Sequence, residues 1–273
     1  MNTETVLSLL ALLLLFPFFT YVFIIVPLQF LFSFGYRHYY HPPSKGDVAF
    51  LKENVPYFNQ LDHKLKKRFI RRVYVFARGR RFISKSSLIQ IDRSQKLLIS
   101  AAIAQLTFGL KVLSLPRFRT IEIHPKFYHF NATGKKQTDH LLTKASAIHL
   151  SWEDFLKGDR TDSEGVNLGL QELTLALSME NKIKNGAYGF LKFDHLMKWR
   201  IQADVEMKAM KHGHADFFPE YAATNQEKFF AVAVEYFFDK PREFSTARPL
   251  LYASMKELLF QDPLIPEWPI LAT

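Results

Sequence analysis

The first 36 residues form an apolar segment in which Glu4 is the only charged residue. Residues 6–34 carry no charge at all, and a helix needs roughly 20 consecutive apolar residues to cross a bilayer. This pattern predicts one N-terminal transmembrane helix within residues 1–36. Because Pro17 and Pro27 can kink a helix, we expect one tilted span followed by a stretch that lies at the membrane interface.

A cleaved signal peptide, a buried core helix and a two-span hairpin are the alternatives for this segment. A signal peptide would have a basic start, a shorter apolar run and small residues at its cleavage site, whereas this chain begins Met-Asn-Thr-Glu-Thr. A buried helix of this length would carry a polar stripe, and a hairpin would need more apolar residues. The single span is therefore the favoured interpretation.

The distribution of basic residues around the apolar segment predicts its orientation. The first five residues contain no lysine or arginine, and Arg37, Lys45 and Lys52 follow the segment. Basic residues next to a span remain on the cytoplasmic side. The pattern therefore indicates a single-pass protein of the inner (cytoplasmic) membrane, with its main domain in the cytoplasm.

Past the apolar segment, residues 37–48 are predicted to be a juxtamembrane linker, since the sequence His-Pro-Pro-Ser-Lys-Gly combines stiff and flexible residue types. One folded domain is expected over residues 49–265. Its alternating stretches predict short strands at 119–124 and 147–152. Apolar residues at helical spacing predict helices over 61–77, 95–110, 167–182, 192–211, 225–238 and 247–260. Early strands followed by many helices are typical of an α+β fold.

Composition narrows the possible classes of protein. The chain has 273 residues, of which 48% are hydrophobic, and it contains no cysteine. This hydrophobic content excludes a disordered chain. The lack of cysteine excludes a disulfide scaffold, a thiol nucleophile and a cysteine-ligated metal.

The positive charge of the chain is local. Residues 37–93 contain 14 lysines and arginines against 4 acidic residues, while the whole chain has a formal net charge of +10. Many of these basic residues lie on the predicted helix 61–77, namely Lys64, Lys66, Lys67, Arg68, Arg71 and Arg72. A solvated helix face is the plain interpretation. Contact with anionic membrane lipid is the sharper one, because the cluster closely follows the anchor; a nucleic-acid partner is not expected without a recognisable binding motif.

Several segments resemble one family of zinc peptidases. Residues 221–238 read YAATNQEKFFAVAVEYFF, and further matching segments are residues 76–82, the helix at 99–110, the strand at 121–127 and the Leu-Ser-Trp at 150–152. Together they resemble the family of Mlc titration factor A (MtfA), whose signature is YAATNPxEFFAVxxEYFF. His124 stands where that family usually has tyrosine. The resemblance spans nearly all of residues 50–263 and implies a zincin-like metallopeptidase domain.

In that family, a motif NxxxHExxHxLD supplies two zinc-binding histidines and a glutamate that acts as general base. In this chain, Asn167 stands at the asparagine of the motif, and Gln171 and Leu175 stand at the two histidine positions. Glu172 stands at the general-base position and Ser178 at the trailing aspartate. The resemblance further suggests Glu227 as the remaining metal ligand and Tyr221 as a site residue of uncertain role. Ser178 and Glu235 are expected to support the ligands from behind, with helix packing as the plain alternative for Glu235.

The two lost histidines decide the functional expectation. Leucine offers no lone pair to a metal, and a glutamine amide is a poor zinc ligand. A zinc site with its full ligand set is worth about 10–16 kcal/mol, and we expect it to stay empty without both imidazoles. The sequence therefore predicts a membrane-anchored pseudopeptidase without a cofactor, which binds a protein or peptide partner in the old cleft. The resemblance implies a possible regulatory partner such as a transcription factor.

Two other functions stay open. An active zinc peptidase could use substitute ligands, and the candidate histidines are His124, His149, His195, His212 and His214. Alternatively, the chain could be a membrane-surface interaction protein that acts through its basic residues.

Overall fold

A computed structural model describes residues 21–25, 43–87, 90–111, 115–125, 147–158, 168–182, 191–214 and 216–265. The chain divides into two compact units, Met1–Ser44 and Lys45–Thr273. In the first unit, only the π-helical turn η1 (Tyr21–Ile25) and residues 43–44 are described. The predicted transmembrane segment therefore lies mostly outside the described residues. Within those residues, no helix is long and apolar enough to cross a membrane.

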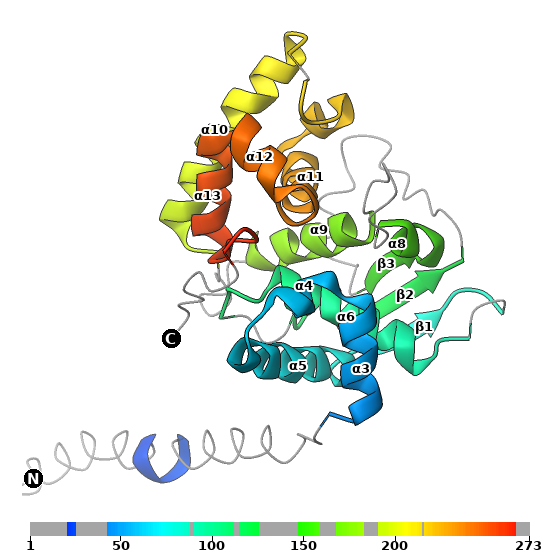
Figure 1. Cartoon of the computed structure of the whole chain (residues 1–273). Helices are drawn as coiled ribbons and strands as arrows, with labels where there is room; N and C mark the ends of the chain where they lie inside the picture. Colours follow the sequence, from blue (N-terminus) through cyan, green and yellow to red (C-terminus); the bar gives the residue numbers. More distant parts are fainter. Residues whose placement is uncertain are drawn as a thin grey trace, which may run out of the picture. The chain divides into compact units, whose positions relative to one another are not determined.

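The second unit is a mixed arrangement of helices around a small sheet, which confirms the predicted α+β class (Figure 1). In chain order, its described elements are α3 (Lys45–Asn54), α4 (Pro56–Gln60), α5 (His63–Arg78), β1 (Arg81–Ser84), α6 (Arg93–Leu106), β2 (Thr120–His124), β3 (Ala147–Ser151), α8 (Trp152–Gly158), α9 (Leu168–Lys182), α10 (Phe193–Lys211), the 3-10 turn η2 (Glu220–Thr224), α11 (Gln226–Asp239), α12 (Pro241–Ala247) and α13 (Pro249–Leu259). Helix α3 begins inside the predicted linker 37–48, and β1 was not expected.

The three strands form a parallel sheet in the order β1-β2-β3. Side chains alternate between the two faces of a strand. Ile121 and Ile123 of β2 and Ile148 and Leu150 of β3 are buried, whereas the residues between them are half-exposed. One face of the sheet therefore belongs to the core, and the other carries polar side chains.

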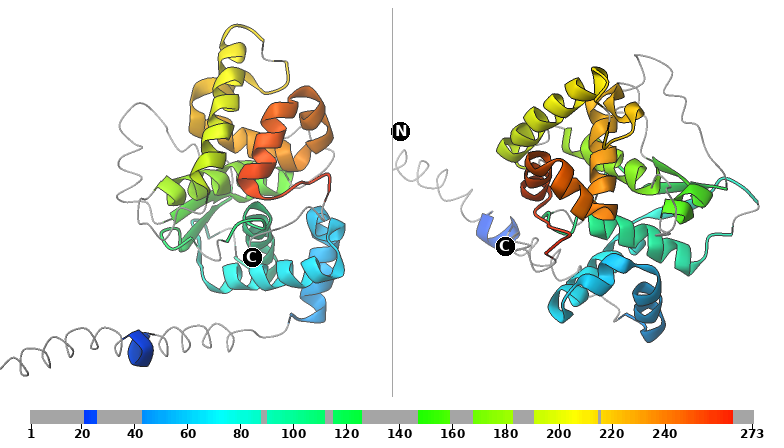
Figure 2. Two further views of the ribbon diagram at one scale, coloured as in Figure 1. Left: turned by 90° about the vertical axis from the view of Figure 1, so that its left-hand side faces the viewer. Right: turned by 45° about the horizontal axis from the view of Figure 1, so that its top comes forward.

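Helix α9 lies at the centre of the second unit. Figures 1 and 2 show it between the group α3–α6 on one side and the group α10–α13 on the other, with the sheet next to it. It packs most extensively on α11 and also contacts α6, α8 and β3. Gly169 permits the contact with α8, because a Cβ there would collide with the ring of Phe155. The segment that carries the degenerate motif is thus held on several sides.

Helix α11 is fixed by aromatic packing. Phe229 and Phe237 are fully buried, and Phe230 is nearly so. The ring of Trp199 from α10 meets the edge of Phe230 at a centroid distance of 4.9 Å, and Phe218 meets Phe229 at 5.3 Å. Such aromatic pairs are worth about 0.5–1.5 kcal/mol beyond their buried area. The aromatic residues of α11 are therefore core residues first, as the sequence predicts.

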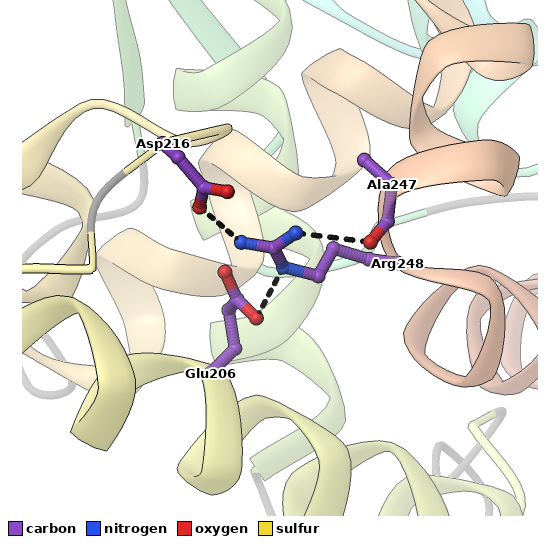
Figure 3. Close-up of polar contacts among 4 residues, drawn as sticks. All are labelled: Glu206, Asp216, Ala247 and Arg248. Carbon is purple, nitrogen blue, oxygen red and sulfur yellow. Dashed lines mark hydrogen bonds and ion pairs between the residues drawn. The ribbon is translucent and has the colours of Figure 1, made fainter.

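An arginine at the start of α13 ties three segments together (Figure 3). The Nε of Arg248 donates to Glu206 of α10 at 2.6 Å, one Nη contacts the carboxylate of Asp216, and the other donates to the carbonyl of Ala247 at 2.9 Å. The hydrogen bond to Glu206 is the largest effect that raises the pKa of Arg248. Because Glu206 is buried, Arg248 supplies the ion-pair partner that a buried carboxylate needs.

Two of the basic residues on α5 contact the chain that follows the end of α6. Arg72 is buried and donates to the carbonyls of Thr107 and, at 2.6 Å, Leu110, which follow the last turn of α6. Arg68 donates to the carbonyl of Phe108 at 3.4 Å and lies over its ring. Burial lowers the pKa of Arg72 to about 10. Cations at a helix C-terminus satisfy carbonyls that lack partners within the helix.

The same helix leaves other basic residues at the surface. Lys66 is half-buried, donates to the carbonyl of Asn59 at 3.2 Å and lies over the Phe58 ring. Lys64, Lys67 and Arg71 are exposed. Of the five residues predicted to face the membrane, Lys67 and Arg71 thus keep an exposed position, whereas Arg72 does not.

Because of this difference in burial, substitution of the two neighbouring arginines should change stability to very different extents. Arg72→Met is expected to lower the free energy of unfolding by about 3 kcal/mol, since two buried carbonyls lose charge-assisted donors. Arg71→Met, one residue away and exposed, should change it by no more than about 0.5 kcal/mol. Urea unfolding followed by circular dichroism measures both. Equal losses in the two variants would contradict the buried role of Arg72.

Candidate functional site

Gln171 of α9 stands at the first histidine position of the family motif, and its amide is fully engaged. Its side chain is 1% exposed. The amide nitrogen donates to Glu235 Oε2 at 2.5 Å and lies 3.5 Å from the hydroxyl of Tyr221. The amide oxygen accepts from Lys228 Nζ at 2.8 Å. Gln171 therefore bridges an acid and a base.

Lys228 enters the site from the first turn of α11. The side chain of Asn225 caps this helix by accepting from the backbone N–H of Lys228 at 2.8 Å. The cap satisfies a free N–H group of the helix start and fixes the backbone from which the lysine extends. The lysine Nζ also lies over the Tyr221 ring, 5.3 Å from its centroid. One positive charge is thus held against Gln171.

Two more residues that the sequence singles out meet in this cluster. Glu235 is buried and lies two turns along α11 from Lys228. Tyr221 belongs to the turn η2 and is 39% exposed, so it forms the outer side of the site. Burial raises the pKa of Tyr221, and the carboxylate of Glu235 adds to this effect. We call Gln171, Glu172, Tyr221, Lys228 and Glu235 the α9–α11 cluster.

Glu172, at the family's general-base position, carries a perturbed carboxyl group. Burial raises its pKa, and the positive charge of Lys228 opposes this shift. Burial disfavours the ionised form of any carboxyl. Among the described residues, its electrostatic neighbour is therefore a lysine, in the part of the site where the family would have a metal ion.

The raised pKa of Glu172 predicts how stability depends on pH. The folded chain keeps this proton to higher pH than the unfolded chain does, so ionisation of Glu172 costs stability as pH rises through the carboxyl range and above it. Glu172→Gln removes that cost, and we expect its gain in unfolding free energy to be larger at pH 8 than at pH 4.

Glu257 is the matched control for this experiment. Its hydrogen bond to Lys198 lowers its pKa, so its contribution to stability is present above the ordinary carboxyl pKa and is lost as pH falls. Glu257→Gln should therefore lose stability at pH 8 and lose less at pH 4. Urea unfolding at both pH values tests the pair, and a gain from Glu172→Gln that is larger at pH 4 would contradict the prediction.

Glu227, predicted to be the remaining metal ligand, lines a different feature. Together with Ser178, it borders a small cavity of about 30 Å³, whose other lining residues are Asn181, Leu191, Leu196, Trp199, Arg200, Gln226 and Phe230. Neighbouring residues on a helix point about 100° apart, so Lys228 and not Glu227 reaches Gln171. Glu227 and Ser178 therefore border this cavity, whereas Lys228 contacts the amide of Gln171.

None of the candidate histidines joins Glu172 in a metal-binding group within the described residues. There, the only group of three possible ligands consists of Glu122, His124 and His149 on the sheet. The Nδ1 of His195 contacts the carbonyl of Glu257, and that of His212 contacts the carbonyl of Lys208. Asn167, the first residue of the motif, lies outside the described residues.

The comparison with known proteins shows the family of this chain. Residues 37–260 match the family described as glucose-regulated metallo-peptidase M90. The chain therefore belongs to this metallopeptidase family, as the motif resemblance to the MtfA-like zinc peptidases indicates.

Individual relatives agree with this assignment. Mlc titration factor A of Salmonella arizonae is 24% identical over 213 residues, which cover 69% of this chain and 83% of that protein. The protein of the same name from Salmonella agona is 30% identical over 125 residues, covering 42% and 45%. A Synechocystis protein, uncharacterized protein slr2042, is 22% identical over 232 residues, covering 80% and 84%.

The signature explains why the ligand prediction was one residue off. Counted from Tyr221, the glutamate of YAATNPxEFFAV falls on position 228, where this chain has lysine. Counted in this way, the resemblance implies Gln171, Leu175 and Lys228 as the family's three ligand positions. An amide, a hydrocarbon and an ammonium group do not fit zinc, which takes imidazole, thiolate and carboxylate ligands. The signature in the sequence therefore already indicates position 228.

Proposed function

We propose that this chain is a membrane-anchored pseudopeptidase of the M90 family, which binds a protein or peptide partner and hydrolyses none. The single observation that carries the proposal is the hydrogen bond from Lys228 Nζ to Gln171 at 2.8 Å. It supports a site in which the charge of a lysine replaces that of a metal ion. Glu172 then has no metal-bound water to activate, because only a metal lowers the pKa of water to near 7.

A binding role is supported by the position of the sheet edge. Among the strands that the structure describes, β3 (Ala147–Ser151) ends the sheet order β1-β2-β3, and it packs beside α9. An edge strand can accept an extended peptide through its backbone groups. The relatives named Mlc titration factor A are, by that name, factors that titrate Mlc, and titration is an act of binding. We carry the act of binding over to this chain, but not the identity of the partner.

Hydrolysis is tested directly with the purified full-length chain and a mixture of unstructured peptides. We expect no cleavage that a chelator suppresses, and the same result for wild type and Glu172→Gln. Chelator-sensitive cleavage that disappears in Glu172→Gln would refute the pseudopeptidase and favour a peptidase with substitute ligands.

Binding is tested with a photo-crosslinking amino acid in place of Tyr221, which lies at the outer side of the α9–α11 cluster. We expect one discrete cross-linked protein in cells, lost when Lys228→Glu is added. The same amino acid at Leu250, an exposed residue of α13, is the control. Identical cross-linked products from both positions would contradict a partner bound at the α9–α11 cluster.

We further propose that residues 1–36 anchor the chain in the inner membrane, with the domain in the cytoplasm and its exposed basic residues near anionic lipid. Each such residue contributes about 1 kcal/mol close to the surface. An alkaline wash of membranes should leave the chain in the pellet. Lys67→Ser with Arg71→Ser should weaken binding of residues 46–273 to anionic vesicles. Release by the wash, or unchanged vesicle binding, would contradict these two statements respectively.

A further inference from the structure

A second polar cluster lies on the opposite side of the sheet from the core. Glu122 and His124 are two residues apart on β2, and the strand register pairs Glu122 with His149 of β3. All three therefore point to the same face. That face is opposite the one formed by Ile121 and Ile123, which are buried in the core.

The donor atoms of this cluster are spaced as metal ligands are. His124 Nε2 lies 3.4 Å from His149 Nδ1, and His149 Nδ1 lies 3.3 Å from Glu122 Oε2. All three ligand atoms are within 4.8 Å of one another. Zinc–nitrogen bonds of about 2.0–2.1 Å in a tetrahedral site place two donors roughly 3.3–3.4 Å apart. The two distances that involve His149 match that requirement.

The chemistry of the three side chains selects the type of ion. Two imidazoles and one carboxylate suit zinc and similar divalent transition metals better than calcium or magnesium. A neutral imidazole is the form that binds metal. Three protein ligands leave a fourth position for water.

Lys85 acts on the cluster in two opposing ways. Its Nζ contacts Glu122 Oε1 at 2.9 Å, which holds the carboxylate so that Oε2 faces His149. Its positive charge also repels a cation bound a few ångströms away. Lys85 thus orients one ligand while it weakens the affinity of the site, and its removal separates the two effects.

We propose that Glu122, His124 and His149 bind one zinc ion on the outer face of the sheet, where it would hold β2 and β3 together. This site shares no residue with the α9–α11 cluster, so the proposal does not rest on the pseudopeptidase. A hydrogen-bond network that binds no metal is the alternative, and the experiment below distinguishes the two.

Zinc chloride titrated into the full-length chain by calorimetry tests the site. We expect one zinc ion per chain and a rise in melting temperature on binding. Loss of a group that merely supports a ligand costs 10–100-fold in affinity, so His149→Gln should weaken binding by about 100-fold or more and Glu122→Gln by at least roughly 10-fold. Unfolding curves of both variants without metal should match wild type.

Three further variants complete the test. His212→Gln alters an exposed histidine of another region and should bind as wild type does. Gln171→Ala should also bind zinc normally, which separates this site from the family's ligand positions. Lys85→Met should bind more tightly, since a like charge is removed. No zinc binding by wild type, or binding that Glu122→Gln and His149→Gln leave unchanged, would overturn the proposal.

Discussion

Restoring the family's ligands is expected to give this chain a zinc site between α9 and α11. The variant Gln171→His, Leu175→His and Lys228→Glu places two imidazoles and one carboxylate at the three ligand positions. A full ligand set binds zinc with about 10–16 kcal/mol in structural sites. We therefore expect one additional zinc ion per chain, retained through dialysis and measured by elemental analysis.

The double variant that keeps Lys228 is the decisive comparison. Two like charges 4 Å apart repel by about 4 kcal/mol at an effective dielectric constant of 20, and this corresponds to about 1000-fold in affinity. Gln171→His with Leu175→His alone should therefore bind zinc at least that much more weakly than the triple variant. Both are made in a Glu122→Gln, His149→Gln background to silence the sheet site. Equal affinities would show that Lys228 does not occupy the ligand position.

The largest expected loss of stability comes from Gly109→Ala. A Cβ at this position would lie below 3.0 Å from the backbone carbonyl oxygens of Leu259 and Phe260. Those atoms belong to the end of α13, and Phe260 is held in a left-handed conformation with φ of 52°. Backbone cannot yield as a flexible side chain can, so we expect a loss of about 3–5 kcal/mol in unfolding free energy.

Gly213→Ala is the matched control, because that glycine is required for its conformation and not for space. Its φ is 88°, and an added Cβ would meet no atom within 4 Å. A left-handed residue other than glycine costs about 1–2 kcal/mol. Thermal and urea unfolding measure both variants. A Gly109→Ala chain as stable as the Gly213→Ala chain would contradict the close approach of Gly109 to the end of α13.

The α9–α11 cluster combines one basic side chain, Lys228, with two acidic ones, Glu172 and Glu235. A zinc site would pair a divalent cation with a carboxylate ligand. Here the ammonium of Lys228 stands at the position of that ligand and is offset by Glu172 and Glu235, with Gln171 between Lys228 and Glu235. Buried polar groups are tolerated when each one has a partner. Gln171 contributes to this arrangement, because its amide accepts a hydrogen bond from Lys228 and donates one to Glu235.

Much of the fold could be predicted from residue patterns. Helices α5, α9 and α11 and the strands β2 and β3 begin and end within about two residues of their expected bounds, because helical and alternating apolar spacing reports burial directly. Strand β1 was missed, since its four residues, Arg-Phe-Ile-Ser, show no alternation. Helix α3 was missed because its mixed residues Lys-Gly-Asp-Val carry no clear apolar stripe.

The candidate site was predicted in part. The residues on α9 were located, whereas the residue of α11 that contacts Gln171 was not. Motif spacing on α9 located Gln171 and Glu172 correctly relative to each other, because neighbours on one helix have fixed relations. The partner from α11 depends on the rotation of that helix against α9, and a shift of one residue turns a side chain by about 100°. The count along the signature indicates position 228, and the structure adds that Lys228 reaches the amide of Gln171.

By itself, the sequence determined the α+β class, the family and the loss of the zinc-binding histidines, because each of these depends on residue types at fixed spacing along one chain. Only the tertiary structure decided which charged side chains are buried and which are exposed. It buried Arg72 against α6 while leaving Arg71 exposed, and it brought Lys228 to Gln171 across 57 residues. It also placed His124 beside His149, 25 residues apart. Contacts between distant residues depend on packing, and no local pattern encodes them.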